Sequence, residues 1–152
     1  ISSAASDVYK RQMLLHPVVH LHLFNSCGEL YLQKRPAWKD IQPGRWDTAV
    51  GGHVDWGEEP LAALRREVRE EVGVTDFEPQ HVLTYLFESE RERELVYVYK
   101  TVYDGPVVPS GELDGGRFWT LREIAEGVGG GIFTPNFEGE IRRVAELPDV
   151  GR

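Results

Sequence analysis

Hydrophobic residues follow a helical spacing between positions 60 and 74 and a strand-like spacing on either side of that segment. Leu61, Leu64, Val68 and Val72 recur at intervals of three and four residues, which predicts one apolar stripe along an amphipathic helix. A proline falls in the first turn, and a glycine follows the last apolar position, where a left-handed helix end favours that residue. The pattern therefore predicts a helix with its own start and stop signals.

Apolar runs before and after this helix predict strands. Residues 18–24 alternate, so their odd and even positions should face opposite sides of a sheet. A turn at 25–28, a loop at 39–45 and a Gly-Gly turn at 51–52 are expected from their turn-forming residues. The remaining elements expected are strands at 29–34, 46–50, 82–87, 95–103 and 117–120, a short helix at 121–126, a glycine-rich loop at 128–131, and a last helix starting at 134–135 that turns Phe137, Ile141 and Val144 inward. This order predicts one α/β layered domain.

Three glutamates share one side of the central helix. At about 100° per residue, Glu67, Glu70 and Glu71 fall on an arc of roughly 100° beside the apolar stripe. Carboxylates this close repel one another unless a cation lies among them. Mg²⁺ prefers oxygen ligands and commonly shares its coordination shell with substrate phosphates. The alternative is an ordinary solvated acidic face, which most Glu- and Arg-rich helix faces are.

The wider spacing argues against that alternative. The segment 52–74 resembles the Nudix box: a glycine, five residues, a glutamate, seven residues, then Arg-Glu-aliphatic-x-Glu-Glu-x-Gly-aliphatic. Val68 and Val74 occupy the aliphatic positions, and the other fixed positions are all matched, by Gly52, Glu58, Arg66, Glu67, Glu70, Glu71 and Gly73. Arg66 lies four residues from Glu70 and could equally reach back to Glu58, so Arg66 and Glu58 are expected to orient the carboxylates rather than to bind metal.

The resemblance implies a Nudix-type α/β/α sandwich with a mixed central sheet, and hydrolysis of a small-molecule diphosphate with Mg²⁺, or Mn²⁺, as cofactor. It implies that metal is held by Glu67, Glu70, Glu71 and the Gly52 carbonyl, with Glu70 and Glu71 also counted as catalytic. The base that takes a proton from the attacking water varies within the family. Glu94 and Glu112 are the candidates, although a loop glutamate such as Glu112 is usually only solvated. The sequence does not determine the oligomeric state; Nudix relatives are often dimers, so the resemblance allows a homodimer.

Within the Nudix families, residues 13–146 resemble the isopentenyl-diphosphate-isomerase-like branch. Four positions match the metal-binding histidines and the acidic pair of that isomerase: His16, His53, Glu92 and Glu94. These residues are candidates for a further metal or substrate site. In a strand, Glu92 and Glu94 would share one face. The isomerase places a catalytic cysteine two residues before its histidine, where this chain has Gly51, and Cys27 lies in an expected turn.

Proton transfer at a carbon needs a positioned acid and base, which a glycine cannot supply. A complete box on an isomerase-like scaffold therefore favours a hydrolase acting on a nucleoside diphosphate derivative or a related organic diphosphate. Isopentenyl-diphosphate isomerase is the alternative. A third interpretation, a non-catalytic ligand-sensing module, is disfavoured by the intact box.

Composition limits the kinds of molecule that the protein is expected to bind. The chain has 152 residues, which suits one domain, and its net charge of −8 argues against a nucleic-acid-binding surface. Its single cysteine excludes an internal disulfide and fits a reducing compartment, so a cytoplasmic location is expected by default. No apolar run approaches the roughly 18 residues of a membrane span. Lys34, Arg35 and Lys39 would suit an anionic substrate, with ordinary surface charge as the alternative.

The first twelve residues, ISSAASDVYKRQ, show no periodicity and no apolar stretch of the kind a signal peptide needs. They resemble a translated sequencing adaptor. We therefore expect residues 1–12 to be a non-native leader and residues 13–152 to form the single Nudix domain. Whether native residues are missing before Met13 is left open by the sequence.

Overall fold

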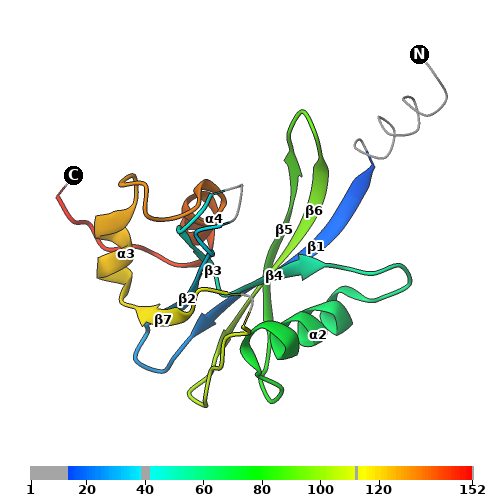
Figure 1. Ribbon diagram of the computed structural model, residues 1–152, viewed down its shortest axis with the longest axis horizontal. Helices are drawn as coiled ribbons and strands as arrows, with labels where there is room; N and C mark the ends of the chain where they lie inside the picture. Colours follow the sequence, from blue (N-terminus) through cyan, green and yellow to red (C-terminus); the bar gives the residue numbers. More distant parts are fainter. Residues whose placement is uncertain (1–13, 39–41, 112, 152) are drawn as a thin grey trace.

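The computed structural model describes residues 14–38, 42–111 and 113–151, and its elements are shown in Figure 1. The strands are β1 (Leu15–Phe24), β2 (Leu30–Lys34), β3 (Trp46–Thr48), β4 (Val50–His53), β5 (Gln80–Glu88), β6 (Arg93–Val102) and β7 (Gly116–Trp119). The helices are α2 (Pro60–Val72), α3 (Leu121–Gly127) and α4 (Pro135–Val144). The expected leader, residues 1–12, lies outside the described residues. No helix in the described part of the chain has the length and apolar character needed to cross a bilayer.

β1 organises a mixed sheet in the order β3-β2-β1-β6-β5. It pairs in parallel with β6 along its whole length, while β5 pairs antiparallel with β6. On its other side, residues 18–21 of β1 pair with β4, and residues 23–24 pair with β2. β2 carries β3 and β7. The β2–β3 pair, called here the β2–β3 arm, and β4 therefore lie along the same side of β1 but pair with different parts of it, so they diverge from each other.

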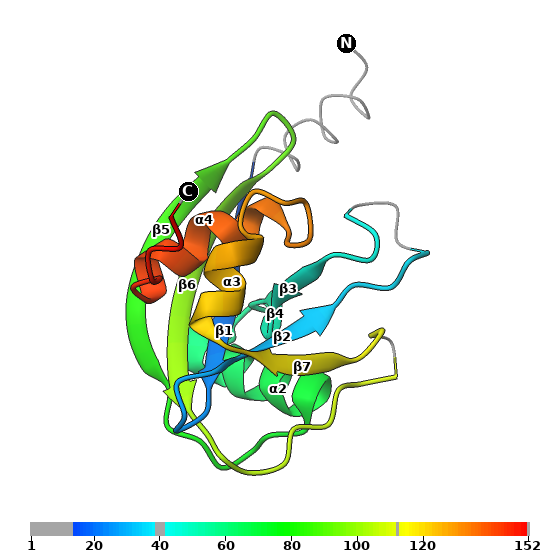
Figure 2. The same ribbon diagram turned by 90° about the vertical axis from the view of Figure 1, so that its left-hand side faces the viewer.

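Helices cover both faces of this sheet (Figures 1 and 2). On one face, the apolar stripe of α2 packs against the odd-numbered residues of β1, and the cluster includes Val19, Leu21, Leu23, Val50, Ala63, Leu64, Val68 and Val72. On the other face, α3 and α4 pack on β2 and β7 through Leu30, Leu32, Trp119, Ile124, Phe133, Phe137 and Ile141. The expected α/β/α sandwich with a mixed sheet is thus confirmed.

The helix ends follow from local sequence signals. α2 begins at Pro60 and ends at Gly73, whose φ of 68° is left-handed and whose N–H donates to the Arg69 carbonyl. α3 has a capping box formed by Thr120 and Glu123. Thr134 caps α4 by accepting a hydrogen bond from the Phe137 N–H. The boundaries predicted for these helices are therefore close to those observed.

One local prediction is wrong. Gly51 and Gly52 form no turn but lie in β4, where they pair with His20 and Val19 of β1. The strand expected at 46–50 is instead broken at Ala49, between β3 and β4. The two glycines are explained by close contacts: a Cβ on Gly51 would meet the His20 ring at 3.3 Å, and one on Gly52 would overlap the Glu67 side chain.

Candidate functional site

The three glutamates of α2 lie together as the helical spacing predicted. Glu67, Glu70 and Glu71 line one cavity of about 520 Å³, with Ser110 and Gly111 opposite. The side chain of Glu70 is 55% exposed, whereas that of Glu67 is 17% exposed. An all-oxygen lining with several negative charges is the chemistry that a hard divalent cation favours.

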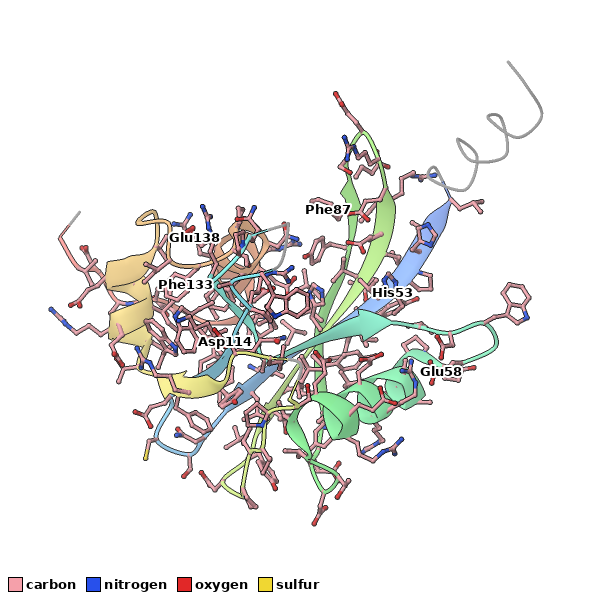
Figure 3. All side chains as sticks on the ribbon, viewed as in Figure 1. His53, Glu58, Phe87, Asp114, Phe133 and Glu138 are labelled. Atoms are coloured by element: carbon pink, nitrogen blue, oxygen red, sulfur yellow. The ribbon has the colours of Figure 1, made fainter. Side chains whose placement is uncertain are left out.

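Arg66 ties this cavity to the loop that follows β4. Its Nε and Nη2 donate to the two carboxylate oxygens of Glu58 at 2.9 Å each, and Nη2 also donates to the His53 carbonyl at 3.0 Å. Its Nη1 donates to Glu67 at 2.7 Å, while Glu70 is 3.8 Å away. Figure 3 shows Glu58 beside α2 and His53 near β1. Arg66 thus holds Glu67 and the loop in one geometry.

The two-pronged bond has an electrostatic consequence for Glu58. Hydrogen bonds from the Arg66 guanidinium and from the Asp55 backbone N–H lower the pKa of Glu58 to about 2. The same contacts with Glu58 and Glu67 raise the pKa of Arg66. Both partners are therefore ionised at neutral pH, which suits the predicted orienting role.

Gly52 brings its backbone directly against the Glu67 carboxylate. A Cβ built on Gly52 would come within 2.2 Å of Glu67 Cδ and 2.6 Å of its Oε1. Only glycine leaves room for this approach. The arrangement places the Gly52 peptide beside the predicted metal ligands.

Replacing Gly52 with alanine should therefore displace the Glu67 carboxylate while the fold survives, because a flexible side chain can move aside. We expect the Mg²⁺ concentration for half-maximal activity to rise roughly tenfold or more, with the free energy of unfolding changed by about 1 kcal/mol or less. Gly139→Ala is the matched control, since a Cβ there meets nothing within 4 Å. An unchanged Mg²⁺ requirement in Gly52→Ala would contradict this role for the glycine.

Glu71 is half-buried on α2, and one of its carboxylate oxygens is out of contact with solvent. Its Oε2 is buried and has no hydrogen-bond partner. Burial and the nearby charge of Glu67 raise the pKa of Glu71 to about 8, although the Gly51 N–H and the Gln33 side chain act in the opposite direction. A buried carboxylate oxygen without a partner is a group that a cation would satisfy.

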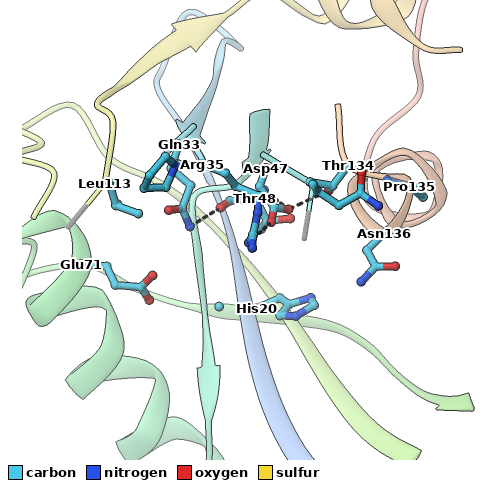
Figure 4. A pocket seen from close by; sticks show the side chains of 13 residues that line it. His20, Gln33, Arg35, Asp47, Thr48, Glu71, Leu113, Thr134, Pro135 and Asn136 are labelled. Carbon is cyan, nitrogen blue, oxygen red and sulfur yellow. Dashed lines mark hydrogen bonds and ion pairs between the residues drawn. The ribbon is translucent and has the colours of Figure 1, made fainter. Parts of the chain in front are cut away.

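Glu71 also lines a second, deeper pocket of about 480 Å³ (Figure 4). This pocket lies where the β2–β3 arm and β4 part. Its walls come from β1, β2, β3, β4, α2 and the start of α4, and include His20, Gln33, Asp47, Thr48, Gly51 and Asn136. Glu71 is thus common to the carboxylate cavity and to a polar pocket large enough for part of a small molecule.

The carboxylates are of the right chemical type to bind a divalent metal, but their side chains are not already arranged as a coordination site. Among residues 14–38, 42–111 and 113–151, no three His, Cys, Asp or Glu side chains form a group that could hold a metal ion as they stand. In this geometry Arg66 neutralises part of the charge that a cation would otherwise balance. The orphaned Glu71 oxygen, the bare Gly52 backbone and the oxygen-only lining are the features that favour a cation here.

The isomerase-like candidates lie elsewhere, on the sheet face opposite α2. His16 pairs with Glu94 between β1 and β6, and His53 pairs with Val18. Glu94 lines a third cavity together with His20 and Glu140. Burial and the charge of Glu92 raise the pKa of Glu94, against the effect of the three nearby histidines at 20, 53 and 16.

One expectation for this group needs correction. Glu92 was expected to share a strand face with Glu94, but β6 begins only at Arg93. Glu92 is exposed in the turn after β5, where its carbonyl accepts a hydrogen bond from Ser89. The alternation rule therefore does not apply to this pair, although the two charges still interact.

The cationic side chains predicted to bind substrate differ in their position relative to the pocket. Arg35 lines the deeper pocket and forms an ion pair with Asp47 at 3.7 Å. Lys34 lies over the Trp46 ring, with its Nζ 6.0 Å from the ring centre, and is not among the residues that line the pocket in the described part of the chain. Lys39 and the candidate base Glu112 lie outside the described residues.

No thiol replaces the isomerase cysteine in the part of the chain that is described. Gly51 sits in β4 under the His20 ring. Cys27 is exposed in the turn between β1 and β2, beyond the end of β1 rather than beside its middle. The site therefore lacks a sulfur acid or base at Gly51.

The sequence did not reveal the partner of His20 and His22. The structure shows that both histidines are hydrogen-bonded to the carboxylate of Glu140 on α4. A signal was available: Glu140 follows Phe137 by three residues and precedes Ile141, so a charged residue falls on the inward face of an apolar helix.

Comparison with known proteins agrees with this geometry. The NUDIX domain family model matches residues 14–137. The isopentenyl-diphosphate Delta-isomerase of Serratia proteamaculans is 30% identical over 131 residues, which cover 83% of this chain and 72% of that protein. An uncharacterized Nudix hydrolase of Pseudomonas aeruginosa is 36% identical over 97 residues, which cover 63% of this chain and 57% of that protein. The chain thus spans little more than half the length of this second relative.

Solved structures show the same fold. A Deinococcus radiodurans protein superposes with a TM-score of 0.74 at 26% identity, covering 84% of this chain and 82% of its own. A MutT protein from Methanosarcina mazei superposes with a TM-score of 0.71 at 24% identity, covering 87% of this chain and 94% of its own, which speaks for the fold alone. With the complete motif on α2, the family match establishes that the chain belongs to the NUDIX domain family.

Proposed function

We propose that this protein is a Mg²⁺-dependent pyrophosphohydrolase that cleaves the diphosphate linkage of a nucleoside diphosphate derivative or a related organic diphosphate. The observation that carries the proposal is the position of Glu71. It lines both the carboxylate cavity of α2 and the polar pocket beyond it, so a diphosphate bound at the carboxylates would extend its organic group into the pocket.

The residues of the site have different proposed roles. Glu67, Glu70 and Glu71, with the Gly52 carbonyl, would hold Mg²⁺ or Mn²⁺. The metal would neutralise the diphosphate oxygens and lower the pKa of a bound water. Arg66, fixed by Glu58, keeps Glu67 against Gly52.

Arg35 contributes positive charge to the pocket wall next to Asp47. Glu94 and Glu112 remain the candidate bases beside Glu70 and Glu71. His16 and His53 on the opposite sheet face, and Glu92 in the turn before β6, remain candidates for a further metal or substrate contact.

The second candidate is isopentenyl-diphosphate isomerase, which the likeness to the Serratia protein favours. Its reaction requires protonation and deprotonation at carbon, and Gly51 supplies neither group where the resembled cysteine would stand. We therefore expect no interconversion of isopentenyl diphosphate. We also expect a homodimer and a cytoplasmic location, which sedimentation and cell fractionation would test.

³¹P NMR of the full chain with Mg²⁺ tests the proposal directly. The panel would contain nucleoside diphosphates, nucleoside triphosphates, ADP-ribose, UDP-glucose and isopentenyl diphosphate. New phosphate resonances that require Mg²⁺ and vanish with EDTA are the expected result. Isomerisation without cleavage of the diphosphate would favour the second candidate, and a folded, Mg²⁺-binding protein that gives no phosphate monoester or inorganic phosphate would refute hydrolysis of these substrates.

A further inference from the structure

A buried carboxylate holds His20 in place from the side away from the pocket. Glu140 on α4 is only 3% exposed. It accepts hydrogen bonds from His20 Nδ1 at 2.9 and 3.0 Å, from His22 Nε2 at 2.7 Å and from the Tyr85 hydroxyl. An ionised carboxylate can only accept, so Nδ1 of His20 must carry a proton and its ring orientation is fixed.

The other nitrogen of His20 faces the polar pocket. The ring lies over Gly51, where a Cβ would stand 3.3 Å from Cδ2 and 3.7 Å from Nε2. No residue in the described ranges hydrogen-bonds to Nε2, whereas Nδ1 is fully engaged. Figure 4 shows His20 and Glu71 on opposite walls of the pocket. A ligand that reaches from Glu71 across the pocket would therefore meet Nε2.

The pocket is built for a polar ligand. Of the side chains that line it, only Pro36, Leu113 and Pro135 are apolar. Burial would lower the pKa of His20, but the hydrogen bond and charge of Glu140, with the charges of Asp47 and Glu94, raise it instead. His20 thus gains in capacity to donate from both nitrogens.

We propose that His20 Nε2 is a substrate-binding group that donates a hydrogen bond to an oxygen of the organic group attached to the diphosphate, with Glu140 as the residue that positions it. The inference rests on the proposed function, because it takes the diphosphate to lie at Glu67, Glu70 and Glu71. It narrows the substrate to a diphosphate whose attached group carries hydroxyl or phosphate oxygens, such as a sugar or nucleoside. A prenyl chain would leave Nε2 and the polar wall unpaired.

Steady-state kinetics of His20→Ala with ADP-ribose, UDP-glucose and ADP as probes tests this assignment. A contact made equally in ground and transition states affects KM rather than kcat. We expect KM for the preferred probe to rise roughly 10- to 100-fold, with kcat changed by about threefold or less. His20→Gln, whose amide can donate near the Nε2 position, should restore part of the affinity. His81→Ala is the matched control, because His81 is exposed on β5, away from the pocket, where it bonds Thr84 of its own strand and contacts the Tyr99 ring.

Glu140→Gln distinguishes positioning from mere structural support. It should raise KM less than His20→Ala does, and should add little in the His20→Ala background, since both changes remove one interaction. A purely structural role would instead give additive effects and a lowered kcat.

Binding without turnover separates this inference from the proposed function. Isothermal titration of the same probes with Ca²⁺ in place of Mg²⁺ should show a His20-dependent Kd. If no probe is hydrolysed but this dependence is present, the proposed function fails and the His20 assignment stands. Equal KM and Kd in wild type and His20→Ala would overturn the assignment. So would a protein that neither binds nor hydrolyses any polar probe, whether or not it hydrolyses isopentenyl diphosphate.

Discussion

Replacing Glu71 with glutamine should reduce phosphate release by roughly 10³-fold or more while leaving the protein folded. The substitution keeps the shape of the side chain but removes the negative charge that a metal-bound diphosphate site needs at the junction of the two cavities. One carboxylate oxygen of Glu71 is buried and has no partner among the described residues, so its charge is available to a cation at that position. ³¹P NMR under saturating Mg²⁺ would measure the loss against wild type.

Stability in EDTA provides an independent readout of the same variant. The pKa of Glu71 is raised to about 8 from an ordinary value of 4.5, so the folded protein binds this proton more tightly than the unfolded chain does. The contribution of Glu71 to wild-type stability should therefore fall as pH rises between about 4.5 and 8, and the fall should be smaller in Glu71→Gln, where only other groups such as His20 still contribute to it. Urea unfolding at pH 5 and pH 8.5 would reveal the difference, with the variant gaining on wild type at the higher pH.

Glu126→Gln is the control for both measurements, because the Glu126 side chain is exposed on α3 and, within the described part of the chain, forms an ion pair with Arg122 alone. It should match wild type in rate and in pH response. Full activity in Glu71→Gln, with wild-type dependence on Mg²⁺, would contradict the central role given to Glu71.

What the sequence revealed well is what local chemistry determines. α2 could be placed almost to the residue because Pro60, the apolar stripe and Gly73 all act within the helix itself. The proximity of Glu67, Glu70 and Glu71 follows from the same helical geometry, and the structure shows them around one cavity.

What it missed depends on contacts between distant segments. Gly51-Gly52 reads locally as a turn, and only pairing with β1 and the approach of Glu67 explain its place in a strand. Glu94 and Glu71 could not be assigned to opposite sheet faces before the parallel pairing of β1 with β6 was known. The contact of Glu140 with the β1 histidines spans 118 to 120 residues of sequence, which no local pattern encodes.

Glu140→Ala should cause the largest loss of stability, a fall of roughly 3–5 kcal/mol in the free energy of unfolding. Glu140 is the common acceptor for donors on β1 and β5, and its removal leaves the buried His22 and the Tyr85 hydroxyl without a partner. Urea unfolding at pH 5.5 would measure the change. Glu146→Ala, an exposed glutamate just after α4, should alter stability by about 0.5 kcal/mol or less.

The stability lost in Glu140→Ala should itself depend on pH. Burial alone would raise the pKa of Glu140, but hydrogen bonds and charge from His20 and His22 outweigh it and hold the pKa below 4.5. This contribution is present above about pH 4.5 and is lost as pH falls further. The pKa of His20 is raised above 6.5, so its contribution is present at lower pH and is lost as pH rises through the raised value.

The difference between wild type and Glu140→Ala should therefore be greatest between about pH 4.5 and 6.5 and should shrink on both sides. Other groups facing this network shift the pH limits of its contribution: the negative charges of Asp47 and Glu94 raise the pKa of His20, and Arg143 lies over the Tyr85 ring. A difference that stays constant from pH 4 to pH 9 would mean that Glu140 acts through packing alone, with no ionised pair between α4 and β1.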